Sequence, residues 1–296
     1  MLSQMIHVLR GTLEEENQLS KLRGNALVLN AVSNDVKKWY EEHINREIIA
    51  YKIIEIRNWP SLSNFVTFPK PQGININMMP IAIGESLPKY LEQYHIMILK
   101  CRIPALEFGK VLYLTIHEEK VPVGKAHRRP GLHIERPGAI MDGGRWSKMG
   151  DPDYGNIAWG NGSWGHDIPV DGIYMASNVS NSCRIWPVTI EKPVEITDRY
   201  GGIEHMRPYL GEGVNLQANE MCWFSDRTPH ESLPLQAPIN DPNAKFVYRQ
   251  FFRLVAGKIS VWYAMHNTPN PLGVQPDCRI SYDNKFEISS SSQCDT

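Results

Sequence analysis

Short apolar or alternating runs recur along the last two thirds of the chain, and turn residues separate them. From about residue 96 onward, Pro, Gly and Asp lie between runs of the length typical of β-strands. The runs cover residues 95–102, 110–117, 172–179, 183–190, 216–224, 246–255 and 258–265. Several strands at this spacing predict a mainly β sandwich or barrel.

The first third carries helical patterns instead. Capping side chains at residues 33–35 precede apolar positions that recur at every fourth residue from Val36 to Ile48. A second helix is predicted from Ser86, with Pro88 in its first turn and Tyr90, Leu91 and Tyr94 on one side. We expect residues 1–94 to form a helix-containing support region on one outer face of a single domain spanning residues 1–296. The polar residues 287–296 are expected to form a frayed tail.

Composition narrows the possible classes of function. The chain has 296 residues, of which 42% are hydrophobic and 21% charged, so a packed core is expected and global disorder is not. A net charge of −1 gives no bulk attraction to nucleic acid or to anionic membranes. No apolar run approaches the ~20 residues of a membrane span. Five scattered cysteines without a C-x-x-C motif, and no signal-peptide pattern, predict reduced thiols and a cytoplasmic location.

Two His-x-Glu pairs could contribute metal ligands. Residues two apart on a strand point to the same face, and His117/Glu119 and His133/Glu135 both meet that condition. His117 ends an apolar run and leads into a charged turn, which is typical of a solvated hairpin end. A long segment rich in Gly and Trp, residues 143–165, follows the second pair and could close over a substrate. The sequence therefore favours His133 and Glu135 over His117 and Glu119, and an exposed polar pair at a strand end is the alternative for either.

A third candidate ligand and two arginines follow later in the chain. His230 lies just after a Thr-Pro dipeptide, at the end of a half-buried alternating run. Residues 246–255 alternate so that Arg249 and Arg253 share one face with Val247 and Phe251. Arginines on an apolar strand are unfavourable unless they have partners. They either pair with acids such as Asp226 or Glu231, or bind carboxylates inside the barrel.

The order His133, Glu135, His230, Arg249 resembles the iron(II)/2-oxoglutarate-dependent dioxygenase superfamily, particularly its clavaminate synthase-like and taurine dioxygenase-like groups. The resemblance covers about residues 95–270 and implies a double-stranded β-helix, the jelly-roll core also found in cupins. It implies that His133, Glu135 and His230 hold Fe(II). It also implies that Arg249 binds 2-oxoglutarate and that Arg253 faces an acidic group of the substrate, although the opposite assignment of the two arginines stays open.

The same resemblance implies an activity. Oxygen (O2) and 2-oxoglutarate would be consumed, succinate and CO2 released, and a small polar or acidic substrate, such as an amino-acid derivative, hydroxylated, desaturated or cyclised. Further candidates for substrate contacts are Trp159 and Trp164 as lid aromatics, Asn181, and Arg227 close to His230 in sequence. A self-packed surface loop for the tryptophans and turn capping for Asn181 are the competing interpretations.

Other classes of function stay open on the sequence alone. A metal cupin that does not use 2-oxoglutarate, either an isomerase or a dioxygenase, would usually gather three or more histidines. A non-catalytic jelly-roll binding module would use His133 and His230 only structurally. Basic residues just before His133 could dock a nucleic acid or protein substrate, but a solvated loop is the favoured interpretation and nucleic acid is not an expected partner. These basic residues are Lys120, Lys125, His127, Arg128 and Arg129.

Overall fold

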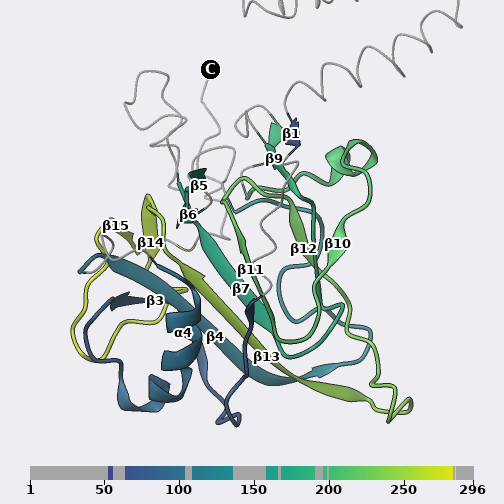
Figure 1. Cartoon of the computed structure of the whole chain (residues 1–296), viewed down its shortest axis with the longest axis horizontal. Coiled ribbons are helices and arrows are strands. Elements are labelled where there is room, and N and C mark those ends of the chain that lie inside the picture. The colour runs from purple at the N-terminus through teal and green to yellow at the C-terminus, as the bar shows by residue number, and fades with distance from the viewer. Residues whose placement is uncertain are drawn as a thin grey trace, which may run out of the picture. The chain divides into compact units, whose positions relative to one another are not determined.

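The computed structural model describes residues 53–55, 64–103, 109–135, 158–165, 168–190, 196–198, 200–282 and 284. The chain divides into two compact units, residues 1–54 and 55–296, and the described elements belong to the second apart from the start of β1 (Ile53–Glu55). The helix predicted at residues 36–48 and the tail predicted at 287–296 lie outside the described residues. The described part of the chain is mainly β (Figure 1), as the sequence predicts.

A six-stranded antiparallel sheet forms the centre of this unit, and we call it the larger sheet (Figure 1). Its strands, in spatial order, are β2 (Asn64–Phe65), β11 (Glu220–Phe224), β7 (Ile173–Ser177), β13 (Phe246–Val255), β4 (Val111–Pro122) and β3 (Asn75–Ala82). A three-stranded antiparallel sheet, the smaller sheet, consists of β10 (Val214–Asn215), β8 (Cys183–Ile185) and β12 (His230–Ser232).

Shorter elements surround these two sheets. β5 (Gly162–Gly165) and β6 (Ile168–Asp171) pair antiparallel, whereas β14 (Val261–Tyr263) and β15 (Arg279–Ser281) pair parallel. The remaining described elements are β9 (Val188–Ile190), the 3-10 helices η3 (Lys89–Tyr94) and η6 (Glu204–Tyr209), and the α-helix α4 (His95–Lys100). No helix in the described ranges combines the length and the apolar character that a membrane crossing requires.

Alternation along β4 divides the core into two layers. Leu112, Leu114 and Ile116 pack with the buried side chains of η3 and α4 on one face of the larger sheet. Tyr113 belongs to the cluster on the other face, which includes Ile185 of the smaller sheet. The helices therefore cover one face of the larger sheet, and the smaller sheet packs towards the opposite face.

The strand predictions match the structure in most places but not at residues 95–102. Strand β13 has the predicted bounds, and β4, β7 and β11 lie at or near their predicted positions. Residues 95–100 instead form α4, so the predicted strand is wrong. Met97 and Cys101, four residues apart, are buried, while Ile96 and Leu99 are exposed. On a strand, Leu99 would share a face with Met97 and Cys101 and would be buried with them. On a helix, residues four apart lie on one side and Leu99 does not, as observed.

Two other predicted elements are present in altered form. The helix predicted from Ser86 is the 3-10 helix η3, in which Leu91 and Tyr94 are buried but Tyr90, predicted on the same side, is exposed. The run predicted at residues 183–190 forms two short strands, β8 and β9, rather than one.

A buried carboxylate ties η3 to the larger sheet. Glu118, on β4, accepts hydrogen bonds from the backbone N–H groups of Gln72 and Ile74 at 2.7 and 2.9 Å. It also accepts one from the hydroxyl of Tyr94 at 2.5 Å and one from the amide of Gln250 at 3.0 Å. Although burial favours the protonated acid, these donors hold the pKa of Glu118 below its usual value of 4.5. The carboxylate is therefore ionised and well partnered at neutral pH.

Replacing Glu118 with Gln is expected to lower the free energy of unfolding by about 2–4 kcal/mol at pH 7, because an amide cannot accept from all four donors. The pKa of Glu118 is lowered on folding, so its contribution is present above pH 4.5 and is lost as the pH falls through the folded pKa. Urea unfolding of both proteins at pH 7 and under acidic conditions measures this. A difference that stays constant as the pH falls would contradict the argument.

Candidate metal centre

Two histidines far apart in sequence lie side by side because their backbones pair. His230 begins β12, and His133 lies in the loop after β4. They form an isolated antiparallel bridge, with His133 N donating to His230 O at 3.0 Å and His230 N donating to His133 O at 2.9 Å. Side chains directly opposite each other in such a pair point to the same side. The two imidazole centroids are 4.5 Å apart.

Each imidazole is oriented by a hydrogen bond to its own local backbone. His133 Nδ1 lies 2.7 Å from the carbonyl oxygen of Gly131, and His230 Nδ1 lies 2.9 Å from that of Thr228. A carbonyl only accepts, so Nδ1 carries a proton on both rings, and Nε2 is the nitrogen left to face the other ring and Glu135. Ligating histidines are characteristically oriented in this way. Burial, followed by the neighbouring His230, lowers the pKa of His133 to about 3, which keeps the ring neutral at pH 7.

The predicted carboxylate lies beside these rings. Glu135 Oε1 is 3.7 Å from His230 Nε2 and 2.5 Å from Nη1 of Arg253. Burial favours its protonated form, but the guanidinium of Arg253 holds the pKa of Glu135 well below its usual value. The structure thus brings the three predicted ligands together, with the carboxylate turned towards Arg253. No set of three His, Cys, Asp or Glu side chains in the described residues is already arranged around a metal position.

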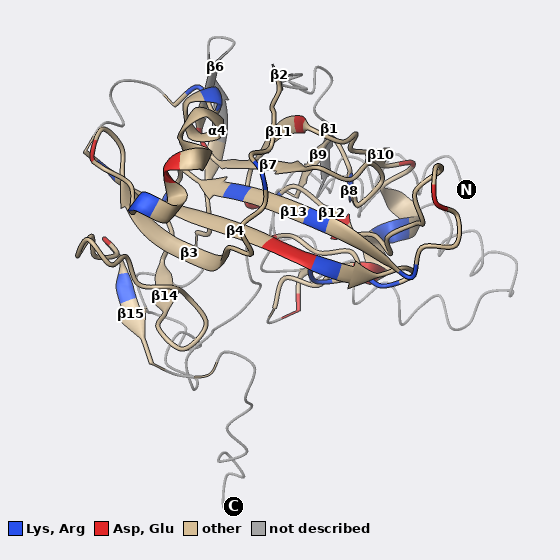
Figure 2. Ribbon diagram, turned by 90° about the horizontal axis from the view of Figure 1, so that it is seen from below, with Lys and Arg blue, Asp and Glu red and all other residues tan. Residues whose placement is uncertain are grey.

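A cavity of about 670 Å³ lies in front of these three side chains. Its walls come from both sheets: β12 of the smaller sheet supplies His230, and β4 and β13 of the larger sheet supply His117, Phe251 and both predicted arginines. Figure 2 shows basic positions along β13 next to the acidic and basic positions of β4. The predicted alternation of β13 is therefore confirmed, with Arg249 and Arg253 on the cavity side.

The two arginines of β13 differ in their partners. Arg249 is 1% exposed, and its Nε donates to Ser177 Oγ at 3.0 Å. Its Nη1 is buried and has no hydrogen-bond partner. Burial lowers the pKa of Arg249 to about 10, so the group is still charged at pH 7. Arg253, in contrast, binds Glu135. Arg249 is thus a buried cation whose unpaired Nη1 could donate a hydrogen bond to a bound anion.

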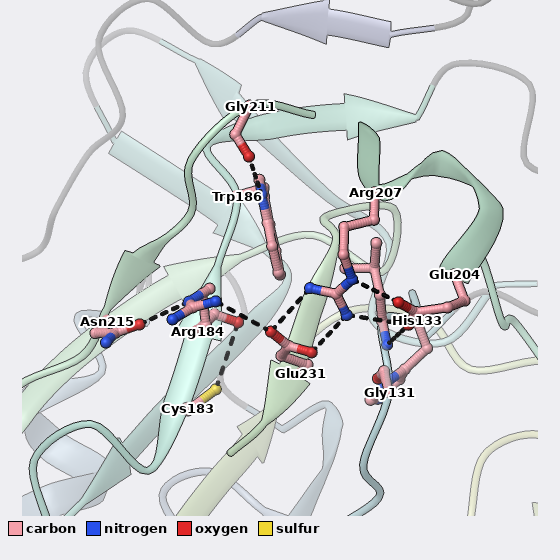
Figure 3. Close-up of polar contacts among 11 residues, drawn as sticks. Gly131, His133, Cys183, Arg184, Trp186, Glu204, Arg207, Gly211, Asn215 and Glu231 are labelled. Atoms are coloured by element: carbon pink, nitrogen blue, oxygen red, sulfur yellow. Dashed lines mark hydrogen bonds and ion pairs between the residues drawn. The ribbon is translucent and has the colours of Figure 1, made fainter. Parts of the chain in front are cut away.

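The alternative that these arginines pair with acids holds for Arg253, which binds Glu135, but neither of the two acids named for it, Asp226 and Glu231, is the partner. Asp226 Oδ2 accepts from the backbone N–H of Trp159 at 3.1 Å. Glu231, which points away from the cavity on β12, is bound by Arg207 through two hydrogen bonds of 3.1 and 2.7 Å, with Arg184 at 3.6 Å (Figure 3).

The network around Arg207 links the segments that carry the two histidines. Arg207, on η6, also binds Glu204 (Figure 3). Glu204 in turn accepts from the backbone N–H of Leu132 at 2.9 Å, next to His133. Glu231 is the neighbour of His230, so one guanidinium connects both carboxylates that flank the histidine pair. This arrangement fixes the loop that carries His133 against β12.

The structure places the other predicted contact residues in different surroundings. Trp159 lines the cavity and is 7% exposed, as part of the wall. Trp164 pairs through its backbone with Pro169 between β5 and β6, and its side chain lies outside the description. Asn181 is exposed in a turn with φ 56°, which fits the turn-capping alternative, and it is not a lining residue. Arg227 is half-buried and is not a lining residue either.

Two predictions about the polar residues near this site are wrong. His117 is not at a solvated hairpin end: it is half-buried and lines the cavity. The basic residues before His133 do not all form a solvated loop, because the His127 side chain is 1% exposed and Arg128 contacts His117 inside the cavity. The register could have indicated His117, since it pairs with Phe251 and so shares a face with Arg249 and Arg253.

No family model, curated protein or solved structure matches this chain.

Proposed function

We propose that this chain is an iron(II)- and 2-oxoglutarate-dependent oxygenase acting on a small acidic molecule. One observation carries the proposal. His133 and His230 are paired through their backbones, and each donates its Nδ1 proton to a carbonyl, which leaves Nε2 as the nitrogen that a metal beside the ionised Glu135 would bind. Two imidazoles and one carboxylate are the donor set of non-haem iron(II) oxygenases.

The fit of a metal to these residues depends on one side chain. His133 is neutral, as a metal ligand must be, and the orientation of both imidazoles is fixed before any ligand binds. Glu135 would complete the set by a change of side-chain rotamer that moves its carboxylate towards the histidines while Arg253 keeps contact with it. Arg253 is then a positioning residue for Glu135, an alternative to its predicted role in substrate binding.

The fit of 2-oxoglutarate depends on Arg249. Its buried, unpartnered Nη1 matches an acceptor oxygen, and a guanidinium fork binds a carboxylate through two parallel hydrogen bonds. Arg249 and Arg253 are four residues apart on one strand, about 13 Å along it. We infer that they bind different groups, with Arg249 holding the far carboxylate of the cosubstrate. The fold proposed with this site is a double-stranded β-helix, supported by two antiparallel sheets on either side of one cavity.

The protein's own residues have defined tasks in this scheme. When bound, iron(II) and 2-oxoglutarate supply the oxidation, in which substrate C–H, O2 and 2-oxoglutarate give substrate C–OH, succinate and CO2. His133, Glu135 and His230 fix the position of the metal. Arg249 orients the cosubstrate from the opposite sheet, and Phe251 and Trp159 form apolar cavity wall that excludes water.

A second candidate is a metal cupin that does not use 2-oxoglutarate. It is favoured by the three further histidines that line the cavity, His117, His127 and His266, because such sites gather three or more imidazoles. Arg128 weakens this candidate, since its Nη1 lies 3.0 Å from His117 Nδ1 and its charge opposes a bound cation there.

Anaerobic addition of iron(II), followed by 2-oxoglutarate, separates these candidates. We expect a visible charge-transfer absorption band that requires both additions, and succinate formation once oxygen is admitted. Iron binding without the band, and without succinate, would favour the second candidate. Failure to bind iron at micromolar concentration would favour a non-catalytic binding module.

A further inference from the structure

Arg128 enters the cavity from the loop between β4 and His133 and is held from three directions. Its guanidinium carbon lies 5.3 Å from the ring centroid of Phe251, so the planar group stacks on that ring. Its Nη1 donates to His117 Nδ1 at 3.0 Å, and its backbone N–H donates to Ser232 Oγ at 3.3 Å. The side chain is therefore fixed in place rather than free in solvent.

Arg128 has no ion-pair partner in the described part of the chain, and Glu135, which Arg253 holds, attracts its charge only from farther away. No described carboxylate forms an ion pair with it, and His117 is kept neutral by burial and by Arg128 itself, which together lower the pKa of His117 to about 2. Burial, with Arg253 close by, lowers the pKa of Arg128 to about 9, so the group is still charged at pH 7. A fixed cation among other cations is unfavourable unless an anion joins them.

Counting charges in the cavity shows which cation is left over. The described lining of the cavity includes three guanidinium groups in the interior, those of Arg128, Arg249 and Arg253, and one carboxylate, that of Glu135. Arg253 is paired with Glu135. Under the proposed function, 2-oxoglutarate uses its two carboxylates on the metal and on Arg249. Arg128 is then the remaining guanidinium inside the cavity, half-buried and on the same side of the larger sheet as the cosubstrate site.

We propose that Arg128, with His117 and Asn75 beside it, binds a carboxylate of the prime substrate. Asn75 is the cross-strand partner of His117 and lines the same cavity, so its side chain lies beside that of His117. A single uncompensated guanidinium matches the single charge and planar shape of a carboxylate. This inference rests on the proposed function and places the acidic end of the substrate on Arg128 rather than on Arg253.

Benzoate and its uncharged amide, benzamide, test the subsite directly. The protein is saturated with 2-oxoglutarate and with Mn(II), which replaces iron without consuming oxygen, and thermal unfolding is followed at constant ionic strength. We expect benzoate to raise Tm and benzamide not to, because a ligand of the folded state stabilises it. In Arg128→Gln the apparent affinity for benzoate should fall at least about ten-fold, the effect of losing one charged hydrogen-bonding partner.

Lys125→Gln is the matched control, because it removes one positive charge from the same loop at an exposed position outside the cavity lining. It should leave the benzoate response unchanged. An equal response in wild type and Arg128→Gln, or no difference between benzoate and benzamide in the wild type, would overturn the inference. If iron and 2-oxoglutarate give no charge-transfer band but the Arg128-dependent benzoate response persists without them, the proposed oxygenase function fails while the carboxylate subsite stands.

The unliganded protein separates binding from structural support. If Arg128 serves a ligand, Arg128→Gln should unfold at the same Tm as the wild type or higher, because the substitution removes an uncompensated charge. Arg128→Lys should restore only part of the benzoate response, since it lacks the planar fork. A Tm several degrees lower without ligand, together with an unchanged benzoate affinity, would show that Arg128 merely supports His117.

Discussion

Replacing His133 or His230 with Ala is expected to abolish the charge-transfer band of the iron(II)–2-oxoglutarate complex and the formation of succinate. Substitution of residues that only orient a ligand already lowers metal affinity by about 10–100-fold. Loss of a ligand itself should therefore weaken iron binding by more than about 100-fold. The variants should still fold, because the bridge between the two residues uses backbone N and O atoms, which alanine keeps. Iron titration under anaerobic conditions and thermal unfolding measure the two effects.

His117→Ala is the control in the same cavity. His117 comes from β4 of the larger sheet, and its ring contacts Arg128 rather than the histidine pair. We expect this variant to keep both the absorption band and its iron affinity. Loss of the band in His117→Ala, with the band preserved in His133→Ala, would show that the other His-x-Glu pair binds the metal.

Local alternation was sufficient to predict the face of β13 that carries the arginines. A period of two residues is a property of any strand, so Arg249 and Arg253 share a face with Phe251 wherever the strand pairs. What the arginines bind could not be predicted in this way. Arg253 meets Glu135, 118 positions earlier in the chain, only because the loop after β4 returns to the cavity.

His117 shows where the local pattern misleads. The charged residues after it suggested that the strand ended there, but β4 continues to Pro122 because all of β13 pairs with it, from Tyr113 to Pro122. Its neighbour Glu118 is buried by partners from three other segments: residues 72–74, Tyr94 and Gln250. Burial of a charged residue thus depended on tertiary contacts that no short window contains.

The strand β3 was missed because its sequence does not alternate. A bulge lies between Ile76 and Met79, Met78 has a φ of 46°, and Pro80 is tolerated because β3 is at the edge of the larger sheet. β12 was missed for a different reason, since it has only three residues. Its His230 was nonetheless predicted as a ligand from its place after a Thr-Pro turn, although its pairing with His133 could not be.

Replacing Arg249 with Met is expected to weaken 2-oxoglutarate binding by about 100-fold or more while leaving iron(II) binding by itself unchanged. A carboxylate buried without its guanidinium partner loses about 3–5 kcal/mol, and each 1.4 kcal/mol is a factor of ten in affinity. Met fills much of the same space, so the cavity wall should keep its packing. The unliganded protein should be at least as stable as the wild type, because Arg249 carries a buried charge with an unpartnered Nη1. Titration of 2-oxoglutarate into the anaerobic iron(II) protein, followed by the charge-transfer band, gives the affinity.

Arg253→Met is the matched comparison, four residues along the same face of β13. Because Arg253 holds Glu135, its loss should weaken iron(II) binding first and 2-oxoglutarate binding only as a consequence. Arg249→Lys should fall between the wild type and Arg249→Met, since lysine keeps the charge but cannot form two parallel hydrogen bonds. If Arg253→Met instead weakens 2-oxoglutarate at saturating iron more than Arg249→Met does, the cosubstrate carboxylate binds Arg253, and Arg249 becomes the free cation that the cavity offers to the substrate.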